Sequence, residues 1–114
     1  MKYIHYPKCS TCQKALKHLE EKGHTLEKRH IVEEKLTKEE LREIHKKSGL
    51  DIKKLFNTSG ILYKEMKLKD KLDIMSLEEK LELLSTNGML VKRPILIDGD
   101  KVIIGYKKEN YDNV

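Results

Sequence analysis

The sequence predicts an α/β fold in which a mixed four-stranded sheet is interrupted by a block of helices. Residues 3–32 show a strand, helix, strand pattern, which implies a right-handed crossover between two parallel strands. Apolar runs at 95–97 and 102–104 flank Asp98-Gly99-Asp100 and predict an antiparallel hairpin with Asp98-Gly99 in its turn. Residues 37–87 carry helical periodicity between these two parts.

The first strand starts at Tyr3 and is broken by Pro7, after which two cysteines bracket the start of a helix. Gly23 is placed to cap the end of that helix, whose apolar face carries Ala15, Leu16 and Leu19. A second strand is expected over 25–32, although its alternation is imperfect.

Two capping boxes mark helix starts in the middle block, one at Thr37–Glu40 and one at Ser76–Glu79. The first helix should stop at Ser48-Gly49, and the second, with Leu77, Leu81 and Leu84 on its apolar face, at Asn87-Gly88. Asp51 is expected to cap a short helical turn. Residues 57–60 are expected to form a loop, and residues 61–66 and 67–72 further helical turns. The tail 109–114 is polar and expected to fray.

Length and composition predict one domain over residues 1–114. The hydrophobic and charged shares are each 38%, which implies a small core under a heavily charged surface. No apolar run approaches the length of a membrane helix and there is no leader pattern, so we expect a soluble cytoplasmic protein. The net charge of +5 comes from lysines that alternate with glutamates, a pattern of solvated helix faces, so no direct DNA binding is expected.

The motif Cys9-Ser10-Thr11-Cys12 at the start of a helix favours reactive sulfur. The free backbone N–H groups and the dipole of a helix N-terminus stabilise a thiolate over a thiol. Cys9 lies at the helix mouth and is the candidate nucleophile. Cys12, one turn further in, can attack a mixed disulfide on Cys9 and release the bound partner.

Three other interpretations of the cysteine pair stay open. A structural disulfide suits a secreted mini-protein, but two cysteines in 114 residues without a signal peptide do not resemble one. A zinc site needs about four ligands, and there is no second CxxC and no histidine pair at finger spacing. We therefore expect no metal and no bound cofactor. The pair can also be incidental, because a lone CxxC is only moderately specific.

The order of elements fits a thioredoxin-like α/β sandwich with an inserted helical block. In that fold a proline before the third strand faces the thiol pair, and Pro94 stands in the matching place. We predict a cis peptide bond between Arg93 and Pro94, with an ordinary trans proline at the start of a strand as the alternative.

The chain resembles the arsenate reductase (ArsC) and Spx family of thioredoxin-fold proteins along nearly its whole length. The resemblance is carried by three segments: Tyr6-Pro7-Lys8-Cys9-Ser10-Thr11-Cys12, Asn87-Gly88-Met89-Leu90-Val91-Lys92-Arg93-Pro94 and Val102-Ile103-Ile104-Gly105-Tyr106. The Lys-Arg-Pro motif after a Gly-Met-Leu turn is the most specific of these.

The resemblance implies a thiol-dependent reductase in which Cys9 attacks the substrate, Cys12 resolves the intermediate and Arg93 holds negative charge. Pro94, Ser10 and Thr11 are expected to position the substrate, together with His5, which is equally well a half-buried strand histidine. The substrate is expected to be an oxyanion, a small thiol or a disulfide, and the electron donor a glutathione-like thiol or thioredoxin.

The chain departs from the family at two places where reductases carry arginines. One arginine is absent from the loop 57–61, and another is replaced by lysine or lost around 106–108. Because lysine is a point charge and not a planar fork, tetrahedral oxyanion binding is expected to be weaker.

The alternative that the resemblance implies is an Spx-type regulator. Such a protein binds the RNA polymerase alpha subunit and uses the disulfide as an oxidation switch. Its arginine in the loop at 58–60 and its longer basic tail are both missing here.

Overall fold

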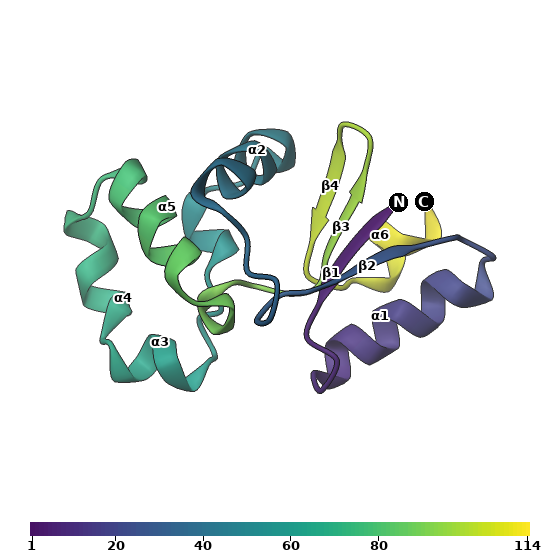
Figure 1. Cartoon of the computed structure of the whole chain (residues 1–114), viewed down its shortest axis with the longest axis horizontal. Coiled ribbons are helices and arrows are strands. Elements are labelled where there is room, and N and C mark those ends of the chain that lie inside the picture. The colour runs from purple at the N-terminus through teal and green to yellow at the C-terminus, as the bar shows by residue number, and fades with distance from the viewer.

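A computed structural model describes all residues, 1–114, and contains a four-stranded sheet in the order β2-β1-β3-β4 (Figure 1). β1 pairs in parallel with β2, whereas the β1–β3 and β3–β4 pairs are antiparallel. The predicted mixed sheet is therefore confirmed. Its elements and their neighbours are β1 (Lys2–His5), α1 (Ser10–Glu21), β2 (Glu27–His30), β3 (Ile95–Asp98), β4 (Lys101–Ile104) and α6 (Lys108–Asp112).

The two faces of the sheet bury different partners because side chains alternate along each strand. Tyr3 points to the face covered by α1 and α6, where it packs with Leu19, Leu96 and Tyr111. Ile4, the next residue, belongs to the larger core on the opposite face. The strands β1 and β3 are thus buried on both sides and form the middle of the molecule.

The helical block between β2 and β3 supplies the larger core. It consists of α2 (Lys38–Ser48), η1 (Ile52–Leu55), α3 (Ile61–Glu65), α4 (Leu68–Lys71), η2 (Leu72–Ile74), α5 (Leu77–Thr86) and η3 (Gly88–Leu90). α2 packs against both β4 and α5, and Figure 1 shows α3 and α4 at the end of the molecule away from the sheet. The molecule is therefore elongated, with extents of 43 × 27 × 25 Å.

Local hydrogen bonds set the helix ends where the sequence predicts them. In both capping boxes the hydroxyl of the first residue, Thr37 or Ser76, accepts from a backbone N–H three residues on, and a glutamate accepts in return. Each such cap contributes about 1 kcal/mol. Asp51 likewise accepts from the N–H of Lys53, and Gly49 ends α2 with φ +68°.

The hairpin turn lies one residue further along the chain than predicted. Asp98 pairs with Lys101, so the two turn residues are Gly99 and Asp100. Gly99 has φ +60° and occupies the first central position, where hairpins of the II′ type place glycine. The predicted cis peptide bond between Arg93 and Pro94 is present.

The prediction of a frayed C-terminal tail is wrong. Residues 108–112 form α6, and the side chain of Tyr111 is fully buried against α1 and the sheet. Lys22 holds this segment by donating to the carbonyls of Tyr111 and Asp112 at 3.2 and 2.6 Å. The error arose because one buried aromatic outweighs the polarity of its neighbours.

Two smaller predictions also need correction. Leu77 was placed on the apolar face of α5, but it is 45% exposed at the first position of the helix. β2 covers only residues 27–30 of the predicted 25–32. The N–H of Ile31 still donates to the carbonyl of His5 at 2.9 Å, but a turn starts at Ile31 and leads toward α2.

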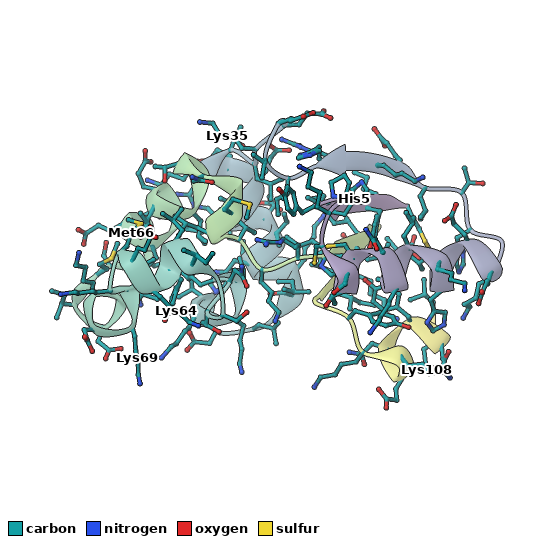
Figure 2. All side chains as sticks on the ribbon, turned by 90° about the horizontal axis from the view of Figure 1, so that it is seen from below. His5, Lys35, Lys64, Met66, Lys69 and Lys108 are labelled. Carbon is teal, nitrogen blue, oxygen red and sulfur yellow. The ribbon has the colours of Figure 1, made fainter.

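Charged side chains cover the outside of both parts of the molecule. Figure 2 shows Lys64 and Lys69 projecting from the helical block and Lys108 from α6. None of the helices combines the length and the apolar composition that a membrane span requires.

The burial of Tyr111 leads to a stability prediction. Tyr111→Ala should lower the free energy of unfolding by about 3 kcal/mol, because it leaves a cavity between α1, α6 and the sheet. Urea denaturation monitored by circular dichroism measures this. Lys107→Ala, at an exposed neighbouring position, should change it by less than about 0.5 kcal/mol. Equal small effects of both substitutions would mean that α6 does not contribute to the core.

Candidate functional site

Cys9 is the N-cap residue of α1 and Cys12 is the third residue of the helix. The turn that leads into the helix is closed by two hydrogen bonds. The N–H of Cys9 donates to the carbonyl of Tyr6 at 2.9 Å, and the side chain of Gln13 donates to the carbonyl of Pro7 at 2.9 Å. The predicted position of both cysteines at the helix mouth is therefore confirmed.

The sulfur of Cys9 is half-buried and is stabilised as a thiolate. Partial burial raises the pKa of Cys9, but other groups outweigh it and the net pKa is lowered. These groups are the backbone N–H of Cys12, the thiol of Cys12, the backbone N–H of Thr11 and the positive charge of Arg93. The two N–H groups belong to the first turn of α1 and have no partner within the helix.

Cys12 has the opposite environment. Its side chain is fully buried, and this burial raises the pKa of Cys12 well above the ordinary value for a thiol. The neighbouring Cys9 raises it further. The hydroxyl of Tyr3 donates to the carbonyl of Cys12 at 2.5 Å, which ties the first turn of α1 to β1. The two sulfurs of one motif therefore differ strongly in acidity and in access to solvent.

An open cleft of about 730 Å³ lies in front of Cys9, between the N-terminal end of α1 and the helical block. Its lining combines polar, cationic and apolar side chains with the sulfur. The residues are Cys9, Thr11, Asn57, Ser59, Gly60, Ile61, Leu62, Glu65, Asn87, Met89, Lys92, Arg93, Gly105 and Tyr106. This volume is typical of sites for small molecules or short peptides.

Arg93 lies in this cleft, but its guanidinium is already partly engaged. One nitrogen donates to the carbonyls of Met89 at 3.2 Å and Val91 at 3.4 Å. The guanidinium also lies over the ring of Tyr6, 5.4 Å from its centroid. Its charge favours the Cys9 thiolate, and these contacts hold the charge in place.

The structure separates the other residues to which the sequence assigns substrate positioning. Thr11 lines the cleft, whereas Ser10 is exposed and Pro94 buried, and neither forms part of its wall. His5 lies at the end of β1, as Figure 2 shows, with its ring 5.1 Å from that of Tyr3. Partial burial lowers the pKa of His5, and the charge of Lys28 adds to this.

Sequence reasoning missed several residues of the cleft, among them Lys92, Glu65, Met89 and Tyr106. The loop 57–61, which lacks the family arginine, forms one wall. Lys92 stands in the Lys-Arg-Pro motif, which was the available signal. Met89 and Tyr106 also stand in segments that carry the family resemblance. Glu65 does not, and no spacing relates it to Cys9.

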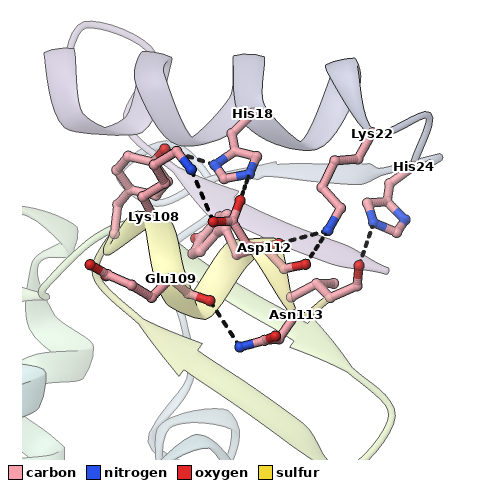
Figure 3. A network of polar contacts seen from close by, with 10 residues as sticks. His18, Lys22, His24, Lys108, Glu109, Asp112 and Asn113 are labelled. Carbon is pink, nitrogen blue, oxygen red and sulfur yellow. Dashed lines mark hydrogen bonds and ion pairs between the residues drawn. The ribbon is translucent and has the colours of Figure 1, made fainter.

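A network of polar contacts joins α1 to α6 (Figure 3), and it includes the hydroxyl of Tyr106. His18 contacts the hydroxyl of Tyr106 at 2.8 Å through Nδ1 and the carboxylate of Asp112 at 2.9 Å through Nε2. Lys108 donates to the same carboxylate at 3.0 Å. Lys108 is thus paired outside the cleft, and the lysines at 107 and 108 do not line it.

Neither a metal site nor a disulfide is formed by the two cysteines. No three side chains among His, Cys, Asp and Glu gather as a potential metal site anywhere in the chain. Both cysteines are free thiols. What the arrangement offers chemically is one accessible thiolate with a second thiol behind it.

The chain is similar in sequence to several known proteins over most of its length. The chain is 53% identical over 107 residues to the protein YusI of Bacillus subtilis, which covers 94% of this chain and 91% of that one. It is 36% identical to an arsenate reductase of Haemophilus influenzae over 92% of this chain and 90% of the relative. It is 31% identical to the global transcriptional regulator Spx of Listeria innocua, over 90% and 77%.

A solved structure confirms the fold assignment. The crystal structure of a putative ArsC family related protein from Bacteroides fragilis superimposes with a TM-score of 0.95 at 47% identity. The match covers 98% of this chain and 94% of that one. The model of the ArsC family matches residues 4–114. With its thioredoxin-like sheet and its relatives among both arsenate reductases and Spx regulators, the chain belongs to the ArsC family.

Proposed function

We propose that the protein is a thiol–disulfide oxidoreductase in which Cys9 is the nucleophile and Cys12 the resolving cysteine. The observation that carries this proposal is the contrast between the two sulfurs. Cys9 is accessible from the cleft and has a lowered pKa, whereas Cys12 is buried and has a raised one. A reactive thiolate in front of a protected thiol is what a two-step exchange requires.

In the first step the Cys9 thiolate attacks one sulfur of a disulfide substrate. A bond forms between Cys9 and that sulfur, the original S–S bond breaks, and the other half leaves as a thiolate. In the second step Cys12 loses its proton and attacks the sulfur of Cys9, which releases the second half. The substrate gains two electrons, and the protein is left with a Cys9–Cys12 disulfide.

The burial of Cys12 has a consequence for the order of these steps. Its thiol stays protonated while Cys9 reacts, so it donates a hydrogen bond to the thiolate and does not compete for the substrate. Once Cys9 is in a mixed disulfide, the negative charge that opposed ionisation of Cys12 is gone. The second thiolate then forms more readily beside its target.

An external thiol must return the protein to its dithiol form. A glutathione-like thiol or a thioredoxin-type protein supplies the two electrons in this proposal, and no bound cofactor is needed. Such a cycle suits the cytoplasm, where a thiol pool keeps cysteines reduced.

Arsenate is a weaker candidate substrate than a disulfide. The cations in the cleft are Lys92 and Arg93, and the guanidinium of Arg93 is partly engaged with backbone carbonyls. One free ammonium does not offer the paired forks that bind a tetrahedral oxyanion well. We expect turnover of arsenate to be far below that of a small disulfide.

A second candidate function is a redox-switched regulator that binds the RNA polymerase alpha subunit. Its support is the similarity to Spx over 90% of this chain. A pull-down with the alpha C-terminal domain, run under reducing and oxidising conditions, tests this function. Binding in one redox state favours the regulator, and no binding in either state favours the enzyme.

The lowered pKa of Cys9 predicts a pH profile. The rate of alkylation by iodoacetamide should reach its midpoint below the value of about 8.5 that a free thiol shows, because only the thiolate reacts. Arg93→Met should move the midpoint to higher pH by removing a positive charge. Cys12→Ser keeps a hydrogen-bond donor and Cys12→Ala does not, so the midpoint should be higher in Cys12→Ala. A wild-type midpoint near 8.5 would contradict the nucleophile assignment.

The roles proposed for Cys9 and Cys12 predict the outcome of a trapping experiment. Cys12→Ser treated with glutathione disulfide should accumulate one mixed disulfide on Cys9, seen as a single added glutathione by mass spectrometry. The wild-type chain should lose two hydrogens instead, because Cys12 resolves the adduct. Cys9→Ser is the matched control and should form almost no adduct, since Cys12 is buried. Adducts on Cys12 in that variant would reverse the assigned roles.

A further inference from the structure

Two neighbouring cations line the cleft, and only one of them is engaged by the protein. Arg93 contacts two carbonyls and the ring of Tyr6. Lys92 has no such partners. The lysines that form ion pairs are Lys17, Lys38, Lys47 and Lys108, so the ammonium of Lys92 has no anion of the protein to neutralise it.

The backbone of Lys92 is nevertheless held in place, and its stem passes close to Gly105. Its N–H donates to the carbonyl of Leu55 at 2.7 Å, beside the bridge that pairs Phe56 with Val91. Its Cε lies 3.4 Å from the point that a Cβ would occupy at Gly105, which is itself part of the cleft wall. Gly105 has φ +81°, and its N–H donates to the carbonyl of Pro94 at 2.8 Å. The aliphatic stem of Lys92 therefore passes beside Gly105 at the wall of the cleft.

The two cations of the cleft, Arg93 and Lys92, have different roles. Arg93 is the charged side chain that lowers the pKa of Cys9 and so acts on the sulfur. Of the two cations in the cleft, Arg93 has the leading effect on that pKa, and Lys92 lines the same cleft. The one carboxylate in the wall is Glu65, on the α3 side. The free ammonium is thus available to a group carried by the substrate.

We propose that Lys92 is the residue that binds a carboxylate on the substrate, so that the cleft selects disulfides with anionic arms. This inference rests on the function proposed above and adds the class of substrate. When Cys9 attacks such a disulfide, one arm stays attached to the sulfur and its carboxylate pairs with the ammonium. The ion pair forms with the mixed disulfide and is lost when Cys12 releases the arm.

Three small disulfides of similar size and different charge test this directly. They are dithiodipropionate, with two carboxylates, hydroxyethyl disulfide, which is neutral, and cystamine, with two ammonium groups. Second-order rate constants for the reaction of each with the reduced Cys12→Ser chain can be followed by mass spectrometry. Each is divided by the rate constant of the same disulfide with a free model thiol, and the neutral disulfide serves as the internal reference.

The expected result is a corrected rate for dithiodipropionate that exceeds that for cystamine by about five-fold or more at low salt. The preference should shrink as salt screens the pair. Lys92→Met should abolish most of it. Lys101→Met is the matched control, because it removes the same charge from β4 outside the cleft, and it should keep the preference of the parent chain.

The possible negative results are distinguishable. If the Cys12→Ser chain with both lysines intact, the parent chain, reacts with none of the three disulfides, both the proposed function and this inference are overturned. If it reacts with all three but shows no order by charge, only the role of Lys92 is overturned. The same holds if Lys92→Met and Lys101→Met reduce the preference equally, because the net charge of the protein then explains it.

Discussion

The first turn of α1, seated on β1, is the constraint on which the rest of the site depends. The hydroxyl of Tyr3 donates to the carbonyl of Cys12, and Tyr3 is itself fully buried between α1 and α6. This contact ties the first turn of α1 to β1, where the side chain of Cys12 is buried, while Cys9 lies at the open end of the helix. A motif that looks symmetric in the sequence therefore becomes asymmetric in burial. The chemical difference between the two sulfurs follows from that asymmetry, because burial disfavours a thiolate and free N–H groups favour it.

The helical block supplies the second wall of the cleft, opposite α1. Without it, Cys9 would face open solvent on one side. The loop 57–61 and η3 come back toward α1 and form the far wall of the cleft. Gly88 lets η3 lie against the segment that follows β2, since a Cβ there would lie 2.0 Å from the carbonyl oxygen of Ile31. The two parts of the molecule are thus in contact at a point where no side chain fits.

The C-terminal segment also contributes to the cleft and its surroundings. Tyr106 lines the cleft and is linked through His18 and Asp112 to α1 and α6. The ring of Tyr111 meets that of Tyr106 edge to face at 4.8 Å. A segment that is polar in composition is therefore part of the support behind the cleft. Its order comes from one aromatic anchor and from Lys22, which caps its last carbonyls.

Features that arise from neighbouring residues could be predicted from the sequence. The strand, helix, strand unit, both capping boxes, the hairpin and the seat of Cys9-Ser10-Thr11-Cys12 at a helix start all depend on local hydrogen bonding and on the period of apolar residues. The fold class followed from their order. The burial of Cys12 and Tyr111, the exposure of Leu77 and the set of residues that line the cleft follow from the packing of the folded chain. Those properties depend on which distant segments pack together, as Lys92 and Gly105 do, and no spacing along the chain encodes that contact.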